Sequence, residues 1–362
     1  MNYYALLVAL VLVTALLMNG TRQGNKNYVI TACVLLFVIY GLRNAYVIGG
    51  DTRTSYYNLF LGTQRLSWQE VIDYAKGTNH LFYLTVKFFN SYISKDYQLY
   101  ISLNALFVTI CFGRMIYRYS SNPLQSILYH FGLLFFTFHF SALKQSIAMA
   151  FLMLAFEQII ERKPVKFVLI VLLAGQFHFP ALAFLPAYLL MKLHPGRAYL
   201  FILAILLLVT YVFRNQILNI MLSLYHDQET TNDLPDVQFL RTKALIMIVI
   251  TVAAMVFRTP TKEDRIYELL LEFMGVAIVF QTFCGYDNIF ERLADYYFQF
   301  SVLFIPMIFD RNADRKTILN YRFLGVADTV APYLFCGYGI YRFLSVVRND
   351  WMFYPFRFFF QK

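Results

Sequence analysis

The stretch of sequence with the most chemical potential is GLRNAYVIGGDTRTSYYNLF at positions 41–60, which follows an apolar run. Asp51 lies between two arginines, of which Arg43 is the first, and it directly follows Gly49 and Gly50. A guanidinium group binds phosphates through paired hydrogen bonds, and a carboxylate can accept a proton from a hydroxyl group. The two glycines let the backbone turn sharply and approach other groups closely. This loop is therefore the first candidate for a binding or catalytic site.

Three more stretches place ionisable side chains beside apolar sequence. They contain His139 and Lys144, then His178 in QFHFP, and then Asp287, Glu291 and Arg292 in GYDNIFERLADYYF. A charge at the centre of a bilayer costs roughly 2.5–3.5 kcal/mol, so such groups usually face the interior of a helix bundle or a wet cavity. We therefore treat these stretches as parts of one candidate site.

Each candidate also has a purely structural explanation, and the sequence leaves both readings open. Arg43 could anchor a helix end at the membrane interface, and Asp51 could belong to an ordinary turn. Lys144, near the start of a helix, could extend its ammonium group towards the interface. His178 has apolar neighbours and could be a packing residue. Glu291 and its neighbour Arg292 could form a plain ion pair.

The composition identifies the kind of protein that carries these residues. Of the 362 residues, 59% are hydrophobic and 14% are charged, whereas soluble domains carry about 25% charged residues. This indicates a polytopic membrane protein and excludes a soluble enzyme. The net charge of +10 lies in short loops, where it fits membrane orientation better than nucleic-acid binding. No cleavable signal peptide is evident near the N-terminus.

We expect an all-α fold, because a membrane-spanning helix needs about 20 mostly apolar residues. The sequence predicts about twelve transmembrane helices in a single transmembrane domain covering 1–362. The predicted ranges are 3–19, 28–42, 97–117, 124–140, 142–160, 165–178, 179–192, 198–214, 242–257, 267–284, 293–309 and 323–345. The segments 43–96 and 214–241 remain outside these spans.

Basic residues predict which loops face the cytoplasm. One set of alternate loops contains 16 Lys and Arg residues, whereas the opposite short connections contain five. Cytoplasmic loops are enriched in Lys and Arg, so the first set is predicted to be cytoplasmic. Both termini and the long loop 43–96 then face outwards, together with all the candidate residues above.

The long outward loop is predicted to contain interfacial helices. In NHLFYLTVKFFNSYI, positions 79–93, apolar residues recur with helical spacing beside a polar face. Such a helix can lie along the membrane surface. An aromatic and polar surface above a cationic cavity would suit a sugar chain attached to a lipid phosphate, although a simple amphipathic lid would explain the pattern equally well.

No cofactor is expected. The four cysteines, Cys33, Cys111, Cys284 and Cys336, all lie in apolar stretches without a CxxC pair, which is typical of free buried thiols. The sequence contains no phosphate-binding glycine loop and no cluster with metal-ligand spacing. We therefore predict neither a bound metal ion nor a bound nucleotide.

Three motifs resemble the EpsG-like branch of the Wzy-type polysaccharide polymerases. The first is the opening loop, with an arginine, a glycine before an aspartate, and a tyrosine, here Tyr56. The second runs from SALKQ, which contains Lys144 and Gln145, to QFHFP, which contains His178. ERLADYYFQF resembles a third, weaker motif. Two departures are Lys144, where the family usually has arginine, and Asn79-His80, where it often has an acid.

The resemblance implies an enzyme, a glycosyltransferase that joins polyprenyl-diphosphate-linked oligosaccharide repeat units at the outer face of the bacterial cytoplasmic membrane. The product would be an O-antigen, a capsule or an exopolysaccharide. Expected partners are this lipid-linked substrate, membrane lipid, a chain-length regulator and other glycan-assembly proteins, but no nucleic acid. The implied roles are substrate binding for Arg43, Lys144, Gln145, Arg292 and Tyr56, and base catalysis or sugar binding for Asp51 and His178.

Other functional classes remain open at this stage. A flippase or other transporter of lipid-linked oligosaccharides would also need a cationic cavity, but transporters commonly carry internal repeats and none is visible here. A membrane acyltransferase acting on the same glycan could use His178. A transferase of single sugars from a lipid phosphate is the closest rival in chemistry, and it would add single residues rather than whole repeats.

The predicted orientation can be tested by thiol labelling in intact cells. Because of the asymmetry in basic residues, cysteines introduced in the 161–166 and 311–316 loops should resist an impermeant thiol reagent, whereas one near position 70 should react. Permeabilised cells, in which all sites should react, are the control. Labelling of the 161–166 site from outside would reverse the predicted active face.

Overall fold

The computed structural model describes residues 2–18, 22–75, 79–196, 198–217, 242–258, 264–284, 288–310 and 321–361. These parts of the chain are helical and contain no β-strand, only one isolated bridge between Arg43 and Phe358. The all-α prediction is therefore confirmed for them. The chain divides into two compact units that each pack mainly within themselves, residues 1–182 with 330–362 and residues 183–329. The prediction of a single domain stays a prediction.

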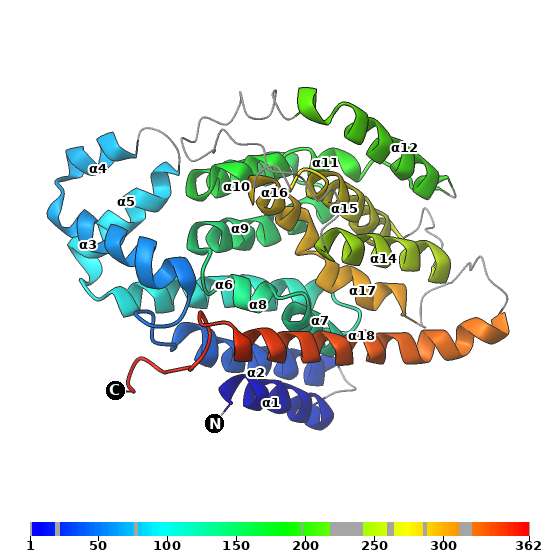
Figure 1. The fold of residues 1–362 in the computed structure, drawn as a ribbon, viewed down its shortest axis with the longest axis horizontal. Coiled ribbons are helices and arrows are strands. Elements are labelled where there is room, and N and C mark those ends of the chain that lie inside the picture. Colours follow the sequence, from blue (N-terminus) through cyan, green and yellow to red (C-terminus); the bar gives the residue numbers. More distant parts are fainter. Residues whose placement is uncertain are drawn as a thin grey trace. The chain divides into compact units, whose positions relative to one another are not determined.

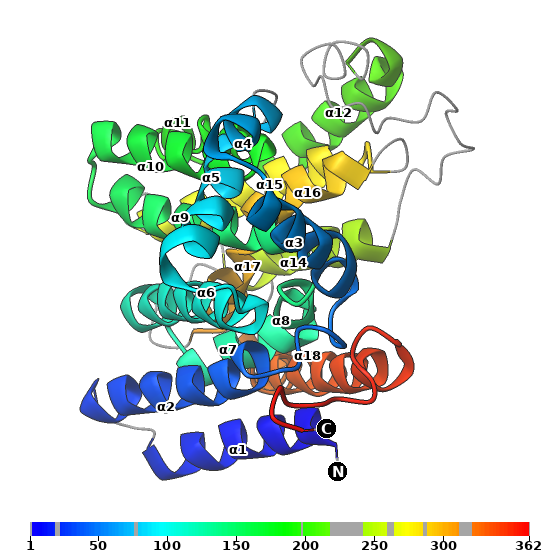
Figure 2. The ribbon, with the colours of Figure 1, turned by 90° about the vertical axis from the view of Figure 1, so that its left-hand side faces the viewer.

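Unit 1 (residues 1–182 and 330–362) is built around a row of apolar helices. Its elements are α1 (Tyr3–Met18), α2 (Arg22–Gly41), η1 (Thr52–Tyr56), α3 (Tyr57–Arg65), α4 (Trp68–Tyr74), α5 (His80–Phe88), η2 (Phe89–Ile93), α6 (Tyr97–Tyr119), α7 (Pro123–Gly132), α8 (Phe135–Phe138), α9 (Leu143–Ile160), α10 (Pro164–Phe177) and most of α18 (Tyr321–Asn349). In Figures 1 and 2, α1, α2, α6, α9 and α10 pack side by side in that order.

Unit 2 (residues 183–329) packs around one buried helix. Its elements are α11 (Ala187–Leu190), α12 (Tyr199–Val212), α14 (Thr242–Phe257), α15 (Arg265–Gln281), α16 (Asn288–Phe298) and α17 (Ser301–Ile308). Helix α15 packs against α11, α12, α14, α16 and α17 and buries most of its side chains. A helix that is apolar on nearly all sides is typical of the interior of a bundle.

Local signals in the sequence set several helix starts. Asp96 accepts a hydrogen bond from the backbone N–H of Gln98 at the start of α6, and Asp264 accepts one at the start of α15. These side chains satisfy N–H groups that have no partner within the helix. Pro123 and Pro164 occupy the first positions of α7 and α10, where a missing N–H costs nothing.

Most predicted helices are present, but three predicted spans are each divided in two. The segment 124–140 breaks between α7 and α8, where Leu134 has φ of 67°. The segment 179–192 forms a 3-10 helix, η3 (Phe179–Phe184), followed by α11. Pro180 and Pro186 lack backbone N–H groups, which opposes one continuous α-helix there. The segment 293–309 divides between α16 and α17.

Among the described residues, three helical segments are long and apolar enough to cross a membrane on their own: 97–119, 143–160 and 329–349. Five shorter apolar segments accompany them, at 3–18, 164–177, 179–190, 199–212 and 242–257. This pattern agrees with a polytopic membrane protein, but it does not establish twelve spans. The predicted helix at 79–93 is present as α5 and η2, whereas its interfacial position stays a prediction.

The ion pairs of unit 1 lie on one of its two predicted sides. Glu157 accepts hydrogen bonds from Arg114 Nε and Nη2 at 2.8 and 2.7 Å, and it also pairs with Arg118. Arg118 and Lys163 bind Glu161 at 3.1 and 2.6 Å. These residues come from, or directly border, loops predicted to be cytoplasmic. The opposite helix ends meet around the opening loop.

Unit 2 has the same separation of charged groups. His194 and Arg265, from predicted cytoplasmic loops, both contact Glu268 on α15, at 3.0 and 3.2 Å. Lys243 and Glu291, from the predicted outward side, form a different ion pair. Within each unit taken by itself, the ion pairs thus join residues of the same predicted side, while the membrane side stays a prediction.

Candidate functional site

The opening loop begins with a buried arginine. Arg43, only 1% exposed, donates from Nη1 to the carbonyl oxygen of Tyr40 and from Nη2 to that of Phe140, the latter at 3.1 Å. Its guanidinium carbon also lies 4.9 and 4.7 Å from the ring centres of Tyr40 and Phe140. No carboxylate pairs with it among the described residues. Arg43 therefore holds the loop onto the turn before α9, and a ligand could touch it only if this cover moved.

The first glycine of the pair fits into a space that no side chain could share. Gly49 has φ of 100°, and a Cβ atom there would lie 2.3 Å from the carbonyl oxygen of Phe140. The N–H of Gly49 donates to the carbonyl oxygen of Met352 at 2.8 Å, and the N–H of Gly50 donates to Ser141 Oγ at 2.8 Å. The glycines thus bring the backbone close to two other segments, as the sequence indicated.

The C-terminal segment packs along one side of the opening loop, a contact that the sequence did not predict. The N–H of Asn44 donates to the carbonyl oxygen of Arg357 at 2.8 Å, and that of Phe359 donates to Leu42 at 3.0 Å. The guanidinium group of Arg53 lies 4.2 Å from the ring centre of Trp351. The run of aromatic and basic residues in WMFYPFRFFFQK was the available signal, because aromatic side chains pair readily with arginine.

The first turn of α6 holds the loop from another side. Gln98 Oε1 accepts from the N–H of Ala45 at 2.9 Å, while its Nε2 donates to the carbonyl oxygen of Gly41 at 3.2 Å. Tyr97 donates its hydroxyl proton to the carbonyl oxygen of Thr52. The loop is therefore fixed at both ends before η1 begins.

Asp51 projects from the loop into the open. It is exposed, and its carboxylate has no hydrogen-bond partner among the described residues. Arg43, eight positions earlier, is buried, so the two side chains have different surroundings. The carboxylate is accessible to a substrate, but its role stays a prediction.

A partly exposed cation lies at the start of α9, within reach of the residue that ends η1. Lys144 Nζ donates to the hydroxyl oxygen of Tyr83 at 2.9 Å and lies 4.6 and 5.2 Å from the ring centres of Tyr83 and Phe82. Tyr56 Oη accepts from the backbone N–H of Lys144 at 3.4 Å. The rings of Tyr56 and Phe82 meet edge to face at 5.6 Å. The structure thus joins Tyr56 and Lys144, two predicted site residues, and adds Tyr83.

A hydrophobic cluster beneath these residues explains why they meet. Phe60, Phe82, Tyr97 and Leu143 belong to its buried part, and Tyr56, Tyr83 and Phe177 pack against it, the last from α10. Helices α5 and η2 pack on this cluster through Phe82, Val86 and Phe89. The predicted apolar face of 79–93 is therefore wrong in part, because Phe88 and Tyr92 on that face are 51% and 68% exposed.

His178 follows α10 and is held by the start of α5. It is buried, and the N–H of the next residue, Phe179, donates to Asn79 Oδ1 at 2.8 Å. Asn79 has φ of 61°, a conformation that asparagine tolerates better than most residues. Asn79 thus has a structural function here, because its side chain fixes the backbone beside His178.

Two other candidate residues near the start of α9, Gln145 and His139, are buried. Gln145 is buried beside Lys144. The next residue, Ser146, has its Oγ 2.9 Å from His139 Nδ1, so His139 takes part in a contact between α8 and α9. Gln145 remains a predicted substrate-binding residue.

Arg292 belongs to unit 2, where it is exposed on α16. Its neighbour Glu291 binds Lys243 Nζ at 3.1 Å, and Lys243 also pairs with the buried Asp295. Glu291 and Asp295 are four residues apart and share one helix face, a spacing that could have suggested a common partner. Asp287 lies outside the described residues.

The described residues contain no cluster of histidine, cysteine and acidic side chains with the geometry of a metal site. The four cysteines are free thiols. Instead, the described residues provide a fixed loop with the exposed carboxylate of Asp51, the ammonium group of Lys144 among aromatic rings, and the buried His178 at the end of α10.

The family model described as the EpsG family matches residues 26–353, nearly the whole chain. No curated protein and no solved structure is significantly similar to this sequence.

The geometry at Gly49 can be tested by Gly49→Ala. A Cβ atom would collide with the Phe140 carbonyl and force an unfavourable φ, so the variant should unfold at a lower temperature, with a loss of more than about 1 kcal/mol. The matched control is Gly62→Ala on α3, because a Cβ atom there meets nothing within 4 Å. Equal melting temperatures for the two variants in detergent would contradict the observed packing of the loop.

Proposed function

Because this chain belongs to the EpsG family, we propose that it is a polysaccharide repeat-unit polymerase of the bacterial cytoplasmic membrane, with its active face outward. Family membership suggests a polysaccharide-polymerase type of function. The observation that carries the proposal is the family match over nearly the whole chain. The substrate would be an oligosaccharide repeat unit linked to a polyprenyl diphosphate.

The proposed reaction forms one glycosidic bond and breaks one bond to phosphate. A hydroxyl oxygen of the acceptor repeat unit attacks the anomeric carbon of the donor glycan. The bond between this carbon and the diphosphate oxygen breaks, and the electron pair leaves with the diphosphate. The hydroxyl proton passes to a base of the protein. The donor carries its own leaving group, so the step consumes no nucleotide.

Lys144 is the side chain best placed to meet the leaving diphosphate. Its ammonium group is partly exposed and is oriented by Tyr83 Oη at 2.9 Å. A cation that is already oriented stabilises the developing charge without reorganisation in the transition state. The surrounding rings of Tyr56 and Tyr83 combine an apolar face with a polar edge, which suits the alternating apolar and hydroxyl surfaces of a sugar.

Arg43 contributes in a different way from Lys144. Its burial under Phe140 supports a role in fixing the opening loop, with its positive charge acting on the diphosphate through the low-dielectric surroundings. Gln145 and the exposed Arg292 are proposed to complete the substrate contacts.

Asp51 is the preferred base, and His178 is the alternative. Asp51 is exposed at the start of η1, on the same short helix that ends at Tyr56. The backbone of the loop on which it lies is fixed by Arg43, Gly49 and Tyr97, so the carboxylate projects from a fixed point at the surface, where it can accept a proton. His178 is buried next to Phe179, which Asn79 holds. A chain-length regulator and other glycan-assembly proteins are proposed as partners.

Deletion of the gene tests the functional class. Without a polymerase, long surface glycans should disappear, whereas single lipid-linked repeat units should remain and reach the outer leaflet. Gel electrophoresis of surface glycans and mass analysis of extracted lipid-linked units measure both. Repeat units trapped in the inner leaflet would point to a flippase, and full-length chains lacking only an acyl group would point to an acyltransferase.

The base can be identified with purified protein and lipid-linked repeat units at saturating concentration. If Asp51 is the base, Asp51→Asn should keep the fold and the binding of donor but slow the reaction by roughly 10²–10⁴-fold, the usual size of general-base catalysis. His178→Gln is the comparison variant. A near-normal rate for Asp51→Asn beside an inactive His178→Gln would transfer the role to His178.

Substitutions of the cations separate charge from geometry. Lys144→Arg should retain most activity, because an arginine keeps the charge among the aromatic rings, whereas Lys144→Ala, Arg43→Ala and Arg292→Ala should abolish polymer while leaving protein in the membrane. Arg43→Lys should be impaired, because one ammonium cannot reproduce the two directed hydrogen bonds of the guanidinium group. Polymer of normal length and amount from Arg43→Ala would exclude this residue from the reaction and leave it a purely structural role.

A further inference from the structure

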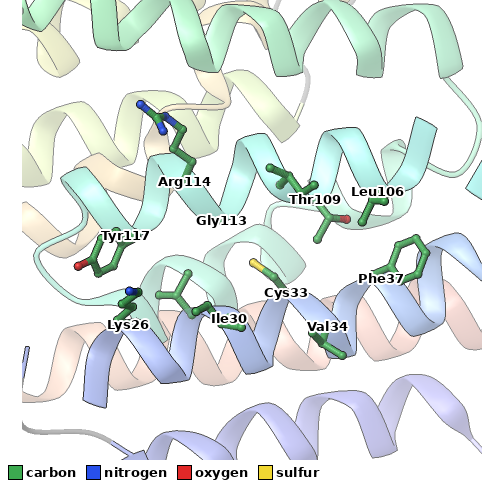
Figure 3. A pocket seen from close by; sticks show the side chains of 12 residues that line it. Lys26, Ile30, Cys33, Val34, Phe37, Leu106, Thr109, Gly113, Arg114 and Tyr117 are labelled. Atoms are coloured by element: carbon green, nitrogen blue, oxygen red, sulfur yellow. The ribbon is translucent and has the colours of Figure 1, made fainter. Parts of the chain in front are cut away.

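An apolar groove runs between α2 and α6 at the ends of these helices that lie away from the opening loop. It has a volume of about 440 Å³, which lies within the range of small-molecule pockets. Its lining includes Ile30 and Val34 from α2 and Ile110 from α6, which are 53%, 55% and 58% exposed. Figure 3 shows the lining side chains in the space between the two helices. The described helices of unit 1 therefore leave this face of the pair open.

One end of the groove carries polar groups. The ammonium group of Lys26 and the hydroxyl group of Tyr117 lie together at this end in Figure 3. Lys26 is exposed and has no ion-pair partner among the described residues. Arg114 also borders this end, but its guanidinium group binds Glu157 at 2.7 and 2.8 Å and points away from α2. The cationic group that is left for a ligand is therefore Lys26.

The groove matches the dimensions of one membrane leaflet. With a rise of about 1.5 Å per residue, Phe37 lies about 16 Å from Lys26 along α2. Half of the hydrocarbon core of a bilayer is about 15 Å thick. An anion at Lys26 would thus sit at the membrane surface, while a chain along the groove would reach the middle of the bilayer.

We infer that this groove holds one acyl chain of an anionic glycerophospholipid, whose phosphate group is bound by Lys26 and Tyr117. The acyl chain would cover the exposed side chains of Ile30, Val34 and Ile110, and the headgroup would pair with the ammonium group of Lys26. A zwitterionic lipid would bring a second cationic group to the same place, so the charge at Lys26 favours the anionic class.

The position of the charge argues against the lipid carrier of the proposed substrate as the occupant. Gly41, the last residue of α2, is about 22 Å from Lys26 along the helix, and the opening loop follows it. A carrier whose diphosphate lies at Lys144 would have its charged end near the opposite end of unit 1. Lipid binding in the groove depends only on its shape and its charge, and it would persist whether or not the protein is a polymerase.

The test uses the full-length protein, purified in a neutral detergent and freed of bound lipid. Phosphatidylglycerol should raise its melting temperature in a saturable way, and phosphatidylcholine should do so much less. Lys26→Gln should weaken the apparent affinity for phosphatidylglycerol about fivefold, the effect of one basic residue at a membrane surface. Ile110→Trp should fill the groove and remove most of the stabilisation.

Two control variants keep the test specific. Lys166→Gln removes an exposed lysine at the start of α10, and Leu169→Trp adds a large side chain to the exposed face of that helix. Both should respond to phosphatidylglycerol as the unaltered protein does. Equal stabilisation by the two phospholipids, or no effect of Lys26→Gln, would overturn the inference. It would also be overturned if a polyprenyl phosphate displaced phosphatidylglycerol with higher affinity and the same dependence on Lys26.

Discussion

The carbonyl oxygen of Phe140 is the point to which the opening loop is attached. Arg43 donates to it from the start of the loop and Thr52 from its end, while Gly49 passes too close for any side chain. The guanidinium group is buried without a carboxylate partner among the described residues, and the desolvation of such a charge costs several kcal/mol. The carbonyl oxygens and the faces of two aromatic rings must offset this cost. If the loop moved, Arg43 would lose these hydrogen bonds and ring contacts. The buried charge therefore fixes one position of the loop.

A connected series of contacts extends from this point to the exposed candidates. The fixed loop sets where η1 begins, and with it the position of Asp51 at its start and Tyr56 at its end. Tyr56 contacts Lys144 directly, and Tyr83 orients the lysine side chain. A buried group thus supports a partly exposed cation and an exposed carboxylate. Such support is what preorganised electrostatic catalysis requires.

Helices α2 and α6 give unit 1 two ends with different chemistry. At one end, Gln98 on α6 binds the backbone that follows α2 and helps to hold the opening loop. At the other end, Lys26 and Tyr117 border an apolar groove. A lipid in that groove would fill the space between the same two helices. Lipid binding would then stabilise the helix pair that carries the candidate site at its far end.

The sequence by itself determined the helical class, most helix positions and the stretches that contain the candidate residues. These follow from local composition, periodicity and capping, which act within a few residues. Tertiary structure alone decided that Arg43 is covered, that Tyr83 binds Lys144 and that the C-terminal segment lines the loop. Arg43 and Phe140 are 97 residues apart and Lys144 and Tyr83 are 61 apart. Burial and pairing at such separations depend on which segments pack together, and no local pattern in one sequence specifies that.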